Sequence, residues 1–366
     1  MKRSNRRLDY LIFFSFLVLL FGVGLAALAS ASSDIGKAKF DDPFYYLKDQ
    51  IVFGIGIGSL GFLAGYLIDY RVYKKLAPLI FIGTVGLLLL LFTPLGVAAG
   101  GARRWISLGS LTIQPSDILK LTIVLYLAAW LSGQKSMREK SVSEGLVPFL
   151  SIIGFISLVL LFQNSTSAAF IICLTACTMY LVSGARWSFI TIIVLIGSLL
   201  FAGFIAASND YRVKRIETFL HPNEDTQGAA YQIDKALTVI GSGGWTGVGY
   251  GQSHIKKFLP ERIGDSIFAI IAEETGFIGV LAVIFLFFTL IFGSFLVGAR
   301  THDKFGRLIA IGLASVIGLQ TAVHIASASS MIPTTGVPLP FISYGNFSLV
   351  TFMTMVGIIL NIHKNS

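Results

Sequence analysis

Long, predominantly apolar runs follow one another along nearly the whole chain of 366 residues. A transmembrane helix needs about 20 consecutive apolar residues to cross the hydrocarbon core of a bilayer. The pattern therefore predicts an all-α polytopic membrane protein with about ten transmembrane helices. The ten runs cover residues 10–30, 51–67, 77–97, 116–132, 147–163, 166–183, 188–207, 267–298, 309–331 and 346–362.

The composition excludes the other broad classes of protein. Hydrophobic residues make up 54% of the chain and charged residues only 13%, whereas a soluble domain carries about 25% charged residues. This balance excludes an ordinary soluble globule, and the apolar content excludes an intrinsically disordered chain. The 2 cysteines cannot build a disulfide framework or a cysteine-rich metal site. We expect residues 1–366 to form a single integral membrane domain.

Basic residues are distributed unevenly between alternate polar segments. Cytoplasmic loops of membrane proteins carry an excess of Lys and Arg. With a cytoplasmic N-terminus that excess is large, so both termini are predicted to be cytoplasmic. The net charge of +9 then mainly reflects topology, which argues against nucleic acid as a partner. The predicted cytoplasmic residues are Lys2, Arg3, Arg6, Arg7, Arg71, Lys74, Lys75, Lys135, Arg138, Lys140, Arg186, Arg300, Lys304, Arg307 and Lys364, and the short external segments hold Lys37, Lys39, Lys48, Arg103 and Arg104.

The first apolar run has some features of a secretory signal peptide. It follows basic residues and ends near Ala27-Leu28-Ala29, which resembles a cleavage site. The run is long for the hydrophobic region of a signal peptide, and nine more spans follow it. We therefore expect it to remain as the first transmembrane helix.

One connection is much longer than the others. Residues 208–266 form a polar external segment between the seventh and eighth predicted helices, and long loops in compact proteins are usually functional. This segment contains the glycine-rich run Gly241–Gly251, which lacks the spacing of a dinucleotide-binding loop. The glycines instead predict close backbone approach or mobility, because glycine tolerates positive φ.

Few charged residues remain inside the predicted spans, and each is costly there. These residues are Asp117, Lys120, Glu273 and Glu274, all at the predicted external ends of the fourth and eighth helices. His324 lies in the outward half of the ninth. This one-sided distribution indicates a site that faces the outer surface.

Each of these residues also has a structural alternative. Asp117 and Lys120 are spaced i, i+3, so they could pair and stabilise the start of their helix. Glu273 and Glu274 are neighbours that face different directions, so we expect at least one to be structural. His324 could be a hydrogen-bonded histidine of the helix bundle. No carboxylate–histidine grouping has metal-ligand spacing.

Arg103 and Arg104 lie just before the fourth predicted helix, on the external side, against the positive-inside trend. Guanidinium groups bind phosphate in a bidentate manner, and the adjacent Trp105 suits the headgroup zone. The sequence thus predicts a phosphate-binding pair here, with an ordinary solvated pair as the alternative.

Asp265 lies where the long segment meets the start of the eighth predicted helix, at about Ser266. A carboxylate at this place can be an N-cap, which stabilises a helix by about 1 kcal/mol. It can also be a general base in contact with the water and headgroup region. The spacing leaves both interpretations open.

Taken together, these residues resemble the SEDS family (shape, elongation, division and sporulation), the FtsW/RodA-type peptidoglycan polymerases. The resemblance runs nearly end to end and is closer to the FtsW branch, because the run Gly251-Gln-Ser253 before Leu259 is short. The blocks that carry it are Gly101-Ala-Arg-Arg-Trp-Ile106, Gln114-Pro-Ser-Asp-x-x-Lys120, Tyr211-Arg-x-x-Arg-Ile216, Ile240-Gly-Ser-Gly-Gly244, Leu259-Pro-Glu…Asp265-x-Ile-Phe…Glu273-Glu274 and Pro333-x-Thr-Gly-Val-Pro-Leu-Pro-Phe-x-Ser-Tyr-Gly345.

The chain also departs from the pattern of that family at several positions. Ile263 and Gly264 stand where His-Thr is common, and His324 stands where asparagine is usual. Gln163-Asn-Ser-Thr166 replaces a Gln-Pro-Asp-Leu-Gly-Thr block, and Ser343-Tyr-Gly-Asn-Phe-Ser348 replaces Ser-Tyr-Gly-Gly-Ser-Ser. Asp265 itself is retained, so the departures concern the substrate more than the reaction.

The resemblance implies transfer of a glycan chain from a donor linked to undecaprenyl pyrophosphate onto the acceptor lipid II. Asp265 would take the proton of the acceptor 4-hydroxyl, and cations would stabilise the departing pyrophosphate. A retaining reaction needs a second carboxylate about 5 Å away. Glu273 lies about 12 Å of helix rise from Asp265, so inversion is expected. The implied substrate- or pyrophosphate-binding residues are Arg103, Arg104, Lys120, Arg212, Arg215, Ser343 and Tyr344, and the implied supporting residues are Gln114, Ser116, Asp117, Glu261, Glu273 and His324.

Other functions remain as alternatives at this point. A lipid II flippase would share the cations and the bundle, but flipping needs a polar path to both faces of the membrane. A scaffold that recruits a transpeptidase would not need Asp265. A RodA-like polymerase for elongation would differ from a septal one only in its cellular role.

The resemblance also implies partners and a location. The expected partners are a class B penicillin-binding protein transpeptidase, divisome proteins and membrane lipids, in the bacterial cytoplasmic (inner) membrane. A divalent cation, Mg²⁺ or Mn²⁺, could assist with the pyrophosphate, but the sequence shows no site for one.

Overall fold

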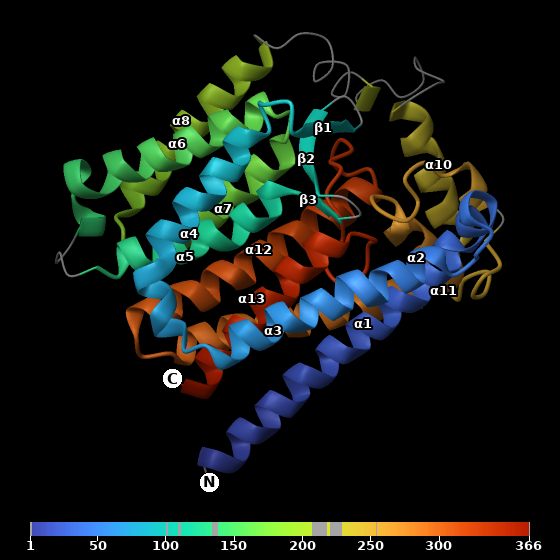
Figure 1. Cartoon of the computed structure of the whole chain (residues 1–366), viewed down its shortest axis with the longest axis horizontal. Coiled ribbons are helices and arrows are strands. Elements are labelled where there is room, and N and C mark those ends of the chain that lie inside the picture. The colour runs from blue at the N-terminus through green and yellow to red at the C-terminus, as the bar shows by residue number, and fades with distance from the viewer. Residues whose placement is uncertain are drawn as a thin grey trace. The chain divides into compact units, whose positions relative to one another are not determined.

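The structure is a computed structural model that describes residues 2–99, 102–108, 111–133, 138–206, 218–219, 229–253 and 255–365. Helices dominate it, and each of the ten predicted apolar runs falls wholly or largely on helical structure (Figure 1). The α-helices are α1 (Lys2–Phe40), α2 (Tyr45–Asp49), α3 (Ile57–Leu67), α4 (Tyr70–Leu90), α5 (Pro115–Leu131), α6 (Val147–Phe162), α7 (Thr166–Val182), α8 (Trp187–Ala206), α10 (Ala229–Ser242), α11 (Ile267–Arg300), α12 (Lys304–Ala328) and α13 (Asn346–Asn365). Short π-helical segments span Gln50–Gly56 and Val142–Leu146, and 3₁₀ turns span Arg138–Lys140 and Ile255–Phe258.

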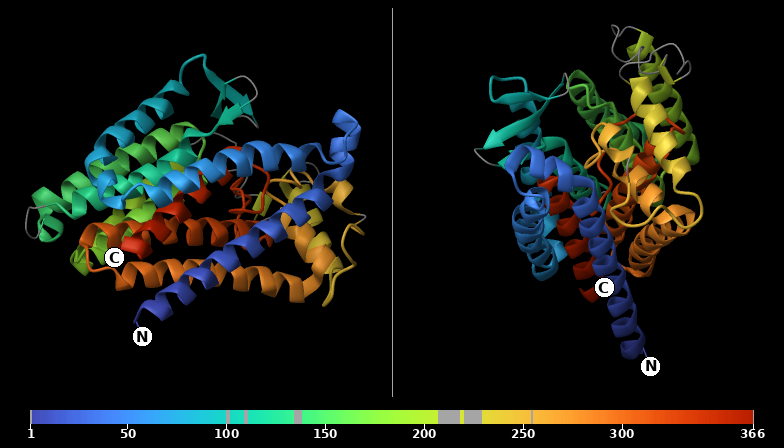
Figure 2. Two further views of the ribbon diagram at one scale, coloured as in Figure 1. Left: turned by 60° about the horizontal axis from the view of Figure 1, so that its bottom comes forward. Right: turned by 90° about the vertical axis from the view of Figure 1, so that its right-hand side faces the viewer.

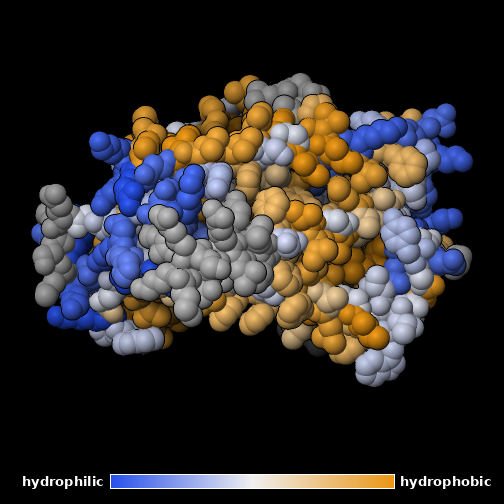
Figure 3. Space-filling view, turned by 90° about the horizontal axis from the view of Figure 1, so that it is seen from below, coloured by the Kyte–Doolittle hydropathy of each residue, from blue (hydrophilic) through white to orange (hydrophobic). Residues whose placement is uncertain are grey.

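Within the described residues, 7 helical segments are long and apolar enough to cross a membrane. Their outer surfaces expose large apolar side chains: Leu79 and Phe162 are each 70% exposed. Apolar residues cover much of the face shown in Figure 3. The prediction of a helical, multi-pass membrane protein is confirmed, while the count of about ten spans and the cytoplasmic termini stay predictions. The 7 segments are Phe13–Phe40, Tyr45–Leu67, Tyr70–Leu90, Val142–Phe162, Ile267–Arg300, Lys304–Ala328 and Asn346–Asn365.

A small β-sheet is the main departure from the all-α prediction (Figure 1). Strands β1 (Gly96–Ala99), β2 (Ala102–Leu108) and β3 (Leu111–Ile113) form an antiparallel sheet in the order β1-β2-β3. The register of β1 against β2 shifts between Val97 and Ala98. A search for long apolar runs passes over strands this short, because they carry few residues each.

The third predicted span, 77–97, is displaced in the structure. Helix α4 begins at Tyr70, where Asp69 caps it by accepting a hydrogen bond from the backbone N–H of Arg71 at 2.9 Å. The first turns of α4 contain basic residues, so the search for apolar runs began the predicted span only at residue 77. The helix ends at Leu90, shortly before Pro94, whose ring disfavours a helical conformation in the residue before it.

The chain divides into two compact units, each assembled from three stretches of sequence. Unit 1 contains residues 1–54, 198–290 and 320–346, and unit 2 contains residues 55–197, 291–319 and 347–366. The two units are described separately below.

Unit 2 holds a layer of helices in which α4, α5, α6 and α7 run side by side (Figures 1 and 2). In the same unit α3 approaches α13 closely, because glycines face the contact. A Cβ on Gly58 would lie 2.3 Å from Sδ of Met353, and one on Gly65 would lie 2.8 Å from the carbonyl oxygen of Thr354. Small residues that allow such approach are typical of packed membrane helices.

Unit 1 is built on α1, α10 and the first part of α11. Phe16 of α1 packs edge-to-face on Phe285 of α11, with ring centroids 5.9 Å apart. The predicted long loop is therefore partly helical: α10 lies inside it and shares a core with α1 and α11. That core consists of Ala31, Ala236, Val239, Leu259, Ala269 and Ile270.

Helix α11 is broken at Gly276, which has φ 66° and ψ −168°. This conformation is essentially restricted to glycine. The glycine-rich loop supplies replacement hydrogen bonds at the break: the N–H of Val248 donates to the carbonyl of Glu273 at 2.9 Å, and the N–H of Phe277 donates to the carbonyl of Gly244 at 2.9 Å. The loop thus holds the first segment of α11 in place.

Close approach of the loop requires glycine at a second position too. Gly247 has φ 79°, and a Cβ there would lie 2.2 Å from the carbonyl oxygen of Glu274. The prediction of close backbone approach in the run Gly241–Gly251 is confirmed.

Candidate active site

Asp265 belongs to a tight turn that leads into α11. The N–H groups of Gly264 and Ser266 both donate to the carbonyl of Glu261, at 3.0 and 3.2 Å. Ser266 immediately precedes the first residue of α11, and its hydroxyl donates to the carbonyl of Pro260 at 3.0 Å. Asp265 therefore lies one residue outside the N-cap position, and it is half-buried.

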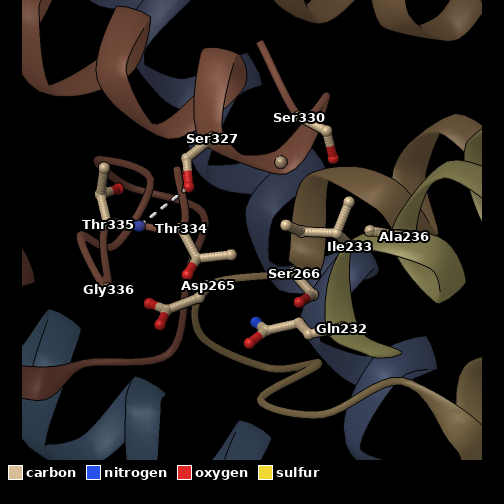
Figure 4. Close-up of a pocket in the computed structure, with 11 residues that line it drawn as sticks. Gln232, Ile233, Ala236, Asp265, Ser266, Ser327, Ser330, Thr334, Thr335 and Gly336 are labelled. Carbon is tan, nitrogen blue, oxygen red and sulfur yellow. Dashed lines mark hydrogen bonds between the residues drawn. The ribbon is translucent and has the colours of Figure 1, made fainter. Parts of the chain in front are cut away.

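A pocket opens beside Asp265 within unit 1. Its walls come from α10, from the turn before α11, and from the end of α12 with the segment that follows it. In Figure 4 the hydroxyl of Thr334 points toward Asp265, whose carboxylate points away from the amide of Gln232. The described residues that line the pocket are Gln232, Ile233, Ala236, Asp265, Ser266, Ser327, Ala328, Ser330, Thr334, Thr335 and Gly336.

Ser343 and Tyr344 support the turn that carries Asp265. The hydroxyl of Ser343 donates to the carbonyl of Gly264 at 2.8 Å and accepts from the N–H of Leu339 at 2.8 Å. The N–H of Tyr344 donates to the carbonyl of Ile263 at 2.9 Å. These contacts use the backbone at positions 263 and 264, so they tolerate the side chains that depart from the family pattern there.

A second tier of contacts fixes Ser343 and Tyr344 themselves. The hydroxyl of Tyr344 and the amide of Asn346 both donate to Asp49, at 2.7 and 2.6 Å, and the amide of Gln50 donates to the carbonyl of Ser343 at 3.4 Å. Burial, and then the hydrogen bond to Asp49, raise the pKa of Tyr344, so its phenol stays protonated and continues to donate. Sequence reasoning missed Asp49 and Gln50, because both precede the apolar run that starts at residue 51.

Glu273 and Glu274 hold the external segment against α11. Both are buried, at 2% and 4% exposure. Glu273 accepts a hydrogen bond from the hydroxyl of Ser253. Glu274 accepts one from the hydroxyl of Ser30 and lies 3.9 Å from the ammonium of Lys256. Both glutamates thus have structural contacts, where the sequence predicted this of at least one.

Buried basic residues complete this network. Lys256 donates to the carbonyl of Ser30 at 3.0 Å, which links the 3₁₀ turn to α1. Arg262 donates to the carbonyl of Lys256 at 3.0 Å and pairs with Asp34 at 2.7 Å. Sequence reasoning missed these residues, because they lie far apart along the chain and no local spacing connects them.

His324 and Gln320 tie α12 to the segment 333–345. Nδ1 of His324 lies 2.7 Å from the carbonyl oxygen of Val337, and because a carbonyl only accepts, Nδ1 carries the proton. Nε2 is buried and has no hydrogen-bond partner among the described residues. The amide of Gln320 donates to the carbonyl of Pro338 at 2.9 Å. The structure thus agrees with the alternative of a hydrogen-bonded bundle histidine.

In unit 2, Asp117 and Lys120 form a buried ion pair on the first turns of α5. The ammonium of Lys120 lies 2.7 Å from Oδ1 of Asp117, and each side chain is 4% exposed. Just before them, the amide of Gln114 donates to the hydroxyl of Ser116 at 3.1 Å. The pairing alternative for these two charges is confirmed.

Arg103 and Arg104 lie on β2 and, as neighbours in a strand, point to opposite faces of the sheet. Arg104 is half-buried and donates a hydrogen bond to the carbonyl of Asn164. Arg103, opposite Ala98 in the ladder, is exposed. The two arginines are therefore not an equivalent pair.

Two predicted cations, Arg212 and Arg215, lie outside the described residues. Within the described ranges, no group of three or more His, Cys, Asp or Glu side chains could hold a metal ion. The structure brings the turn of Asp265 and Glu261 together with Ser343 and Tyr344, which belong to a separate sequence block. The structure also adds pocket residues that no sequence spacing predicted, chiefly Gln232 and Ser330.

Comparison with known proteins places the chain in a family. Residues 10–366 match the family model FTSW_RODA_SPOVE, described as "Cell cycle protein". The chain is 36% identical over 352 residues to stage V sporulation protein E of Bacillus subtilis, covering 95% of each chain. It is 36% identical over 347 residues to a protein of Geobacter sp. strain M18 named probable peptidoglycan glycosyltransferase FtsW, covering 94% of each.

A solved structure shows the same fold. One chain of a structure described as "Structural coordination of polymerization and crosslinking by a peptidoglycan synthase complex" aligns with a TM-score of 0.79 at 24% identity, covering 96% of this chain and 97% of that one. The family match, the two relatives and this shared fold span nearly the whole sequence. The chain therefore belongs to the FtsW/RodA/SpoVE family of cell cycle proteins.

Proposed function

We propose that the protein is a peptidoglycan glycosyltransferase that polymerises lipid II into glycan strands at the outer face of the bacterial cytoplasmic membrane. The observation that carries this proposal is the half-buried carboxylate of Asp265, which lines a pocket of polar side chains in unit 1. Relatives named as probable peptidoglycan glycosyltransferases support the reaction type.

In the proposed reaction Asp265 is the general base. A sugar hydroxyl is a weak nucleophile, so a positioned carboxylate must remove its proton as it attacks the anomeric carbon of the donor. The carboxylate of Glu273 is buried against Ser253, and Glu261 lies on the exposed side of the turn. Neither arrangement suggests a second nucleophile, which supports direct displacement with inversion.

The departing pyrophosphate needs cationic stabilisation. The candidates remain those predicted from the sequence, and the contacts of the described ones differ. Lys120 is neutralised by Asp117 and Arg104 already binds a backbone carbonyl, whereas Arg103 is exposed on β2. A divalent cation such as Mg²⁺ or Mn²⁺ would supply further positive charge when bound to the pyrophosphate oxygens. Arg212 and Arg215 complete the set of candidates.

The cellular role is proposed to be septal wall synthesis during division, together with divisome proteins and a class B penicillin-binding protein transpeptidase. The FtsW names among the relatives support division, and the shared fold with a polymerising and crosslinking complex supports a transpeptidase partner. Elongation, as in RodA-type proteins, is the alternative role.

One experiment tests the activity. The purified full-length protein is incubated with labelled lipid II in detergent, with and without a class B transpeptidase, and the products are separated by size. The same protein in vesicles is assayed for transfer of labelled lipid II between leaflets. Polymer formation is the expected result. Translocation without polymer would instead identify a flippase, and neither activity with the transpeptidase present would identify a scaffold.

A further inference from the structure

The glycine-rich run Gly241–Gly251 exposes large side chains although it belongs to a polar external segment. Trp245 is 72% exposed, Tyr250 61% and Val248 43%, and the run contains no charged residue. Exposed apolar side chains that gather on a surface mark contact with another protein or with the membrane. The depth of the run relative to the apolar spans distinguishes these two cases.

Trp245 lies at the predicted external end of the membrane-spanning part of α11. Its ring packs edge-to-face on Phe277, with ring centroids 5.3 Å apart. Phe277 follows the break at Gly276, and the helix continues from there to Arg300. That stretch rises about 35 Å at ~1.5 Å per residue, which is enough to cross a hydrocarbon core of about 30 Å. Trp245 therefore lies at the boundary of that core, where Trp and Tyr are enriched in membrane proteins.

Helix α11 exposes an apolar stripe that begins next to Trp245. The members of the stripe follow one another at intervals of three or four residues, so they share one face of the helix. On a membrane-spanning helix such a face meets the apolar part of the bilayer. The stripe consists of Phe277, Leu281, Phe285 and Phe288, which are 49%, 49%, 58% and 60% exposed. Through its contact with Phe277, Trp245 extends this stripe into the external segment.

Tyr250 lies against a second helix, α1 (Figure 1). Its hydroxyl donates to the carbonyl of Ala26 at 3.0 Å. Ala26 lies inside the first predicted apolar run, 10–30, about 6 Å of helix rise from the end of that run. Because the hydroxyl is bonded within the protein, the exposed ring of Tyr250 does not need water.

Other contacts with α1 show that the run is the deepest described part of this segment. Lys256 donates to the carbonyl of Ser30, and Arg262 pairs with Asp34. Both contacts lie nearer the predicted external end of α1 than Ala26 does. From Ala26 to Asp34 the helix rises about 12 Å. The charged part of the segment is thus the shallower part, and the uncharged run is the deeper one.

The backbone of the run is bonded within the protein at this depth. Non-helical backbone inside a membrane protein must satisfy its polar groups internally. The N–H groups of Val248 and Gly249 donate to the carbonyls of Glu273 and Glu274, at 2.9 and 3.1 Å. These bonds let the run approach lipid without presenting those two N–H groups to it.

We propose that the run Gly241–Gly251 is an interfacial anchor, which inserts the rings of Trp245 and Tyr250 among the phospholipids of the leaflet on the predicted external side. The partner is the lipid at the boundary between headgroups and acyl chains, because the exposed rings continue the lipid-facing stripe of α11 and the run has no charge that would have to leave water. The anchor fixes the depth of the break at Gly276, to which the loop is hydrogen-bonded. Anchoring of this kind does not depend on the reaction proposed above.

Quenching of tryptophan fluorescence by lipid tests the depth of Trp245. The full-length protein is placed in phospholipid nanodiscs whose acyl chains carry bromine near the headgroup end, and its emission is compared with that in unbrominated discs. The contribution of Trp245 is the difference between the parent and Trp245→Phe. Brominated lipid should remove more than half of that contribution, because the ring lies at the depth of the bromine. Acrylamide dissolved in the water should remove much less of it.

A matched pair of spin labels makes the test independent of tryptophan. Val248→Cys and Lys257→Cys, each combined with Cys173→Ala and Cys177→Ala, place a nitroxide at two exposed positions of the same segment. Oxygen concentrates in lipid, whereas a nickel chelate stays in water. The label at position 248 should be relaxed more by oxygen, and the label at position 257 more by nickel.

Two results would overturn the anchor. Quenching of Trp245 by acrylamide and not by brominated lipid, with a nickel-accessible label at position 248, would show that the run lies in water. Protection of Trp245 from both quenchers would show that another protein surface, in this preparation a second copy of the chain, covers the run instead of lipid.

Discussion

Asp265 in unit 1 and Asp117 in unit 2 are both carboxylates close to the start of a long helix, but their surroundings differ. Asp117 is 3% exposed and lies 2.7 Å from the ammonium of Lys120. Asp265 is half-buried, lies in the turn before α11, and lines a pocket of hydroxyl and amide groups.

This difference indicates that Asp117 has a structural role, whereas Asp265 is the candidate general base. A buried ion pair is costly to disrupt, because removing one partner leaves the other charge in a medium that solvates it poorly. A general base must reach the proton that it removes. Contact with an open pocket, and not the mere presence of charge near the membrane, therefore distinguishes the candidate base.

The largest expected effect is on Asp265. Asp265→Asn should lower lipid II polymerisation by about 10²–10⁴-fold, because the amide cannot accept the proton of the acceptor hydroxyl. Thermal unfolding in detergent should stay close to that of the parent, since Asp265 lies one residue outside the N-cap position of α11. Near-normal glycan synthesis by the purified variant would contradict the assignment of Asp265 as the base.

The matching substitution in unit 2 should act on stability instead. Asp117→Asn should lower the free energy of unfolding by about 3–5 kcal/mol, because Lys120 loses its carboxylate partner while it stays buried. Denaturation in detergent measures this. The double variant Asp117→Asn with Lys120→Met should recover much of the loss. An unchanged free energy of unfolding in the single variant would contradict the structural role assigned to Asp117.

A third prediction concerns the break in α11 at Gly276, which packs against the glycine-rich loop. Gly276→Ala should lower the free energy of unfolding by about 3 kcal/mol, because the conformation of Gly276 is essentially restricted to glycine. A Cβ there would also lie 2.3 Å from the backbone nitrogen of Gly247. Gly241→Ala is the control, since a Cβ at that position meets nothing within 4 Å. Equal stability of both variants would show that the break is not fixed by Gly276.

The smallest expected effect is at Ser343, which supports the Asp265 turn through its hydroxyl. Ser343→Ala should lower kcat about 10-fold and leave the KM for lipid II unchanged, because two hydrogen bonds of about 1 kcal/mol each are lost. Ser151→Ala, which removes a hydroxyl bonded only within α6, should have no effect. A raised KM with unchanged kcat would instead support the direct substrate contact that the sequence suggested.

Sequence reasoning succeeded where the determinant is local. Apolar runs located the helices, and the i, i+3 spacing of Asp117 and Lys120 identified their pair. Glycines in the run Gly241–Gly251 indicated close backbone approach. Sequence reasoning failed for the β-sheet of residues 96–113 and for the start of α4. Short strands and a basic first turn do not appear in an apolar pattern.

The site itself could be predicted only in part. Asp265 and its block were identified, but Gln232, Ser330 and Asp49 were not. These residues are separated from Asp265 by 33 to 216 positions along the chain. No periodicity relates them, and only the packing of α10, α11, α12 and α2 in unit 1 brings their segments together.

The sequence by itself determined that this chain is a helical membrane protein with few charges and one aspartate at the mouth of a long external segment. That follows because burial in a bilayer acts on each residue and each run separately. Only the tertiary structure decided which carboxylate is neutralised and which lines a pocket. Charge partners and hydrogen-bond partners are set by distance in space, which no single run of the sequence determines.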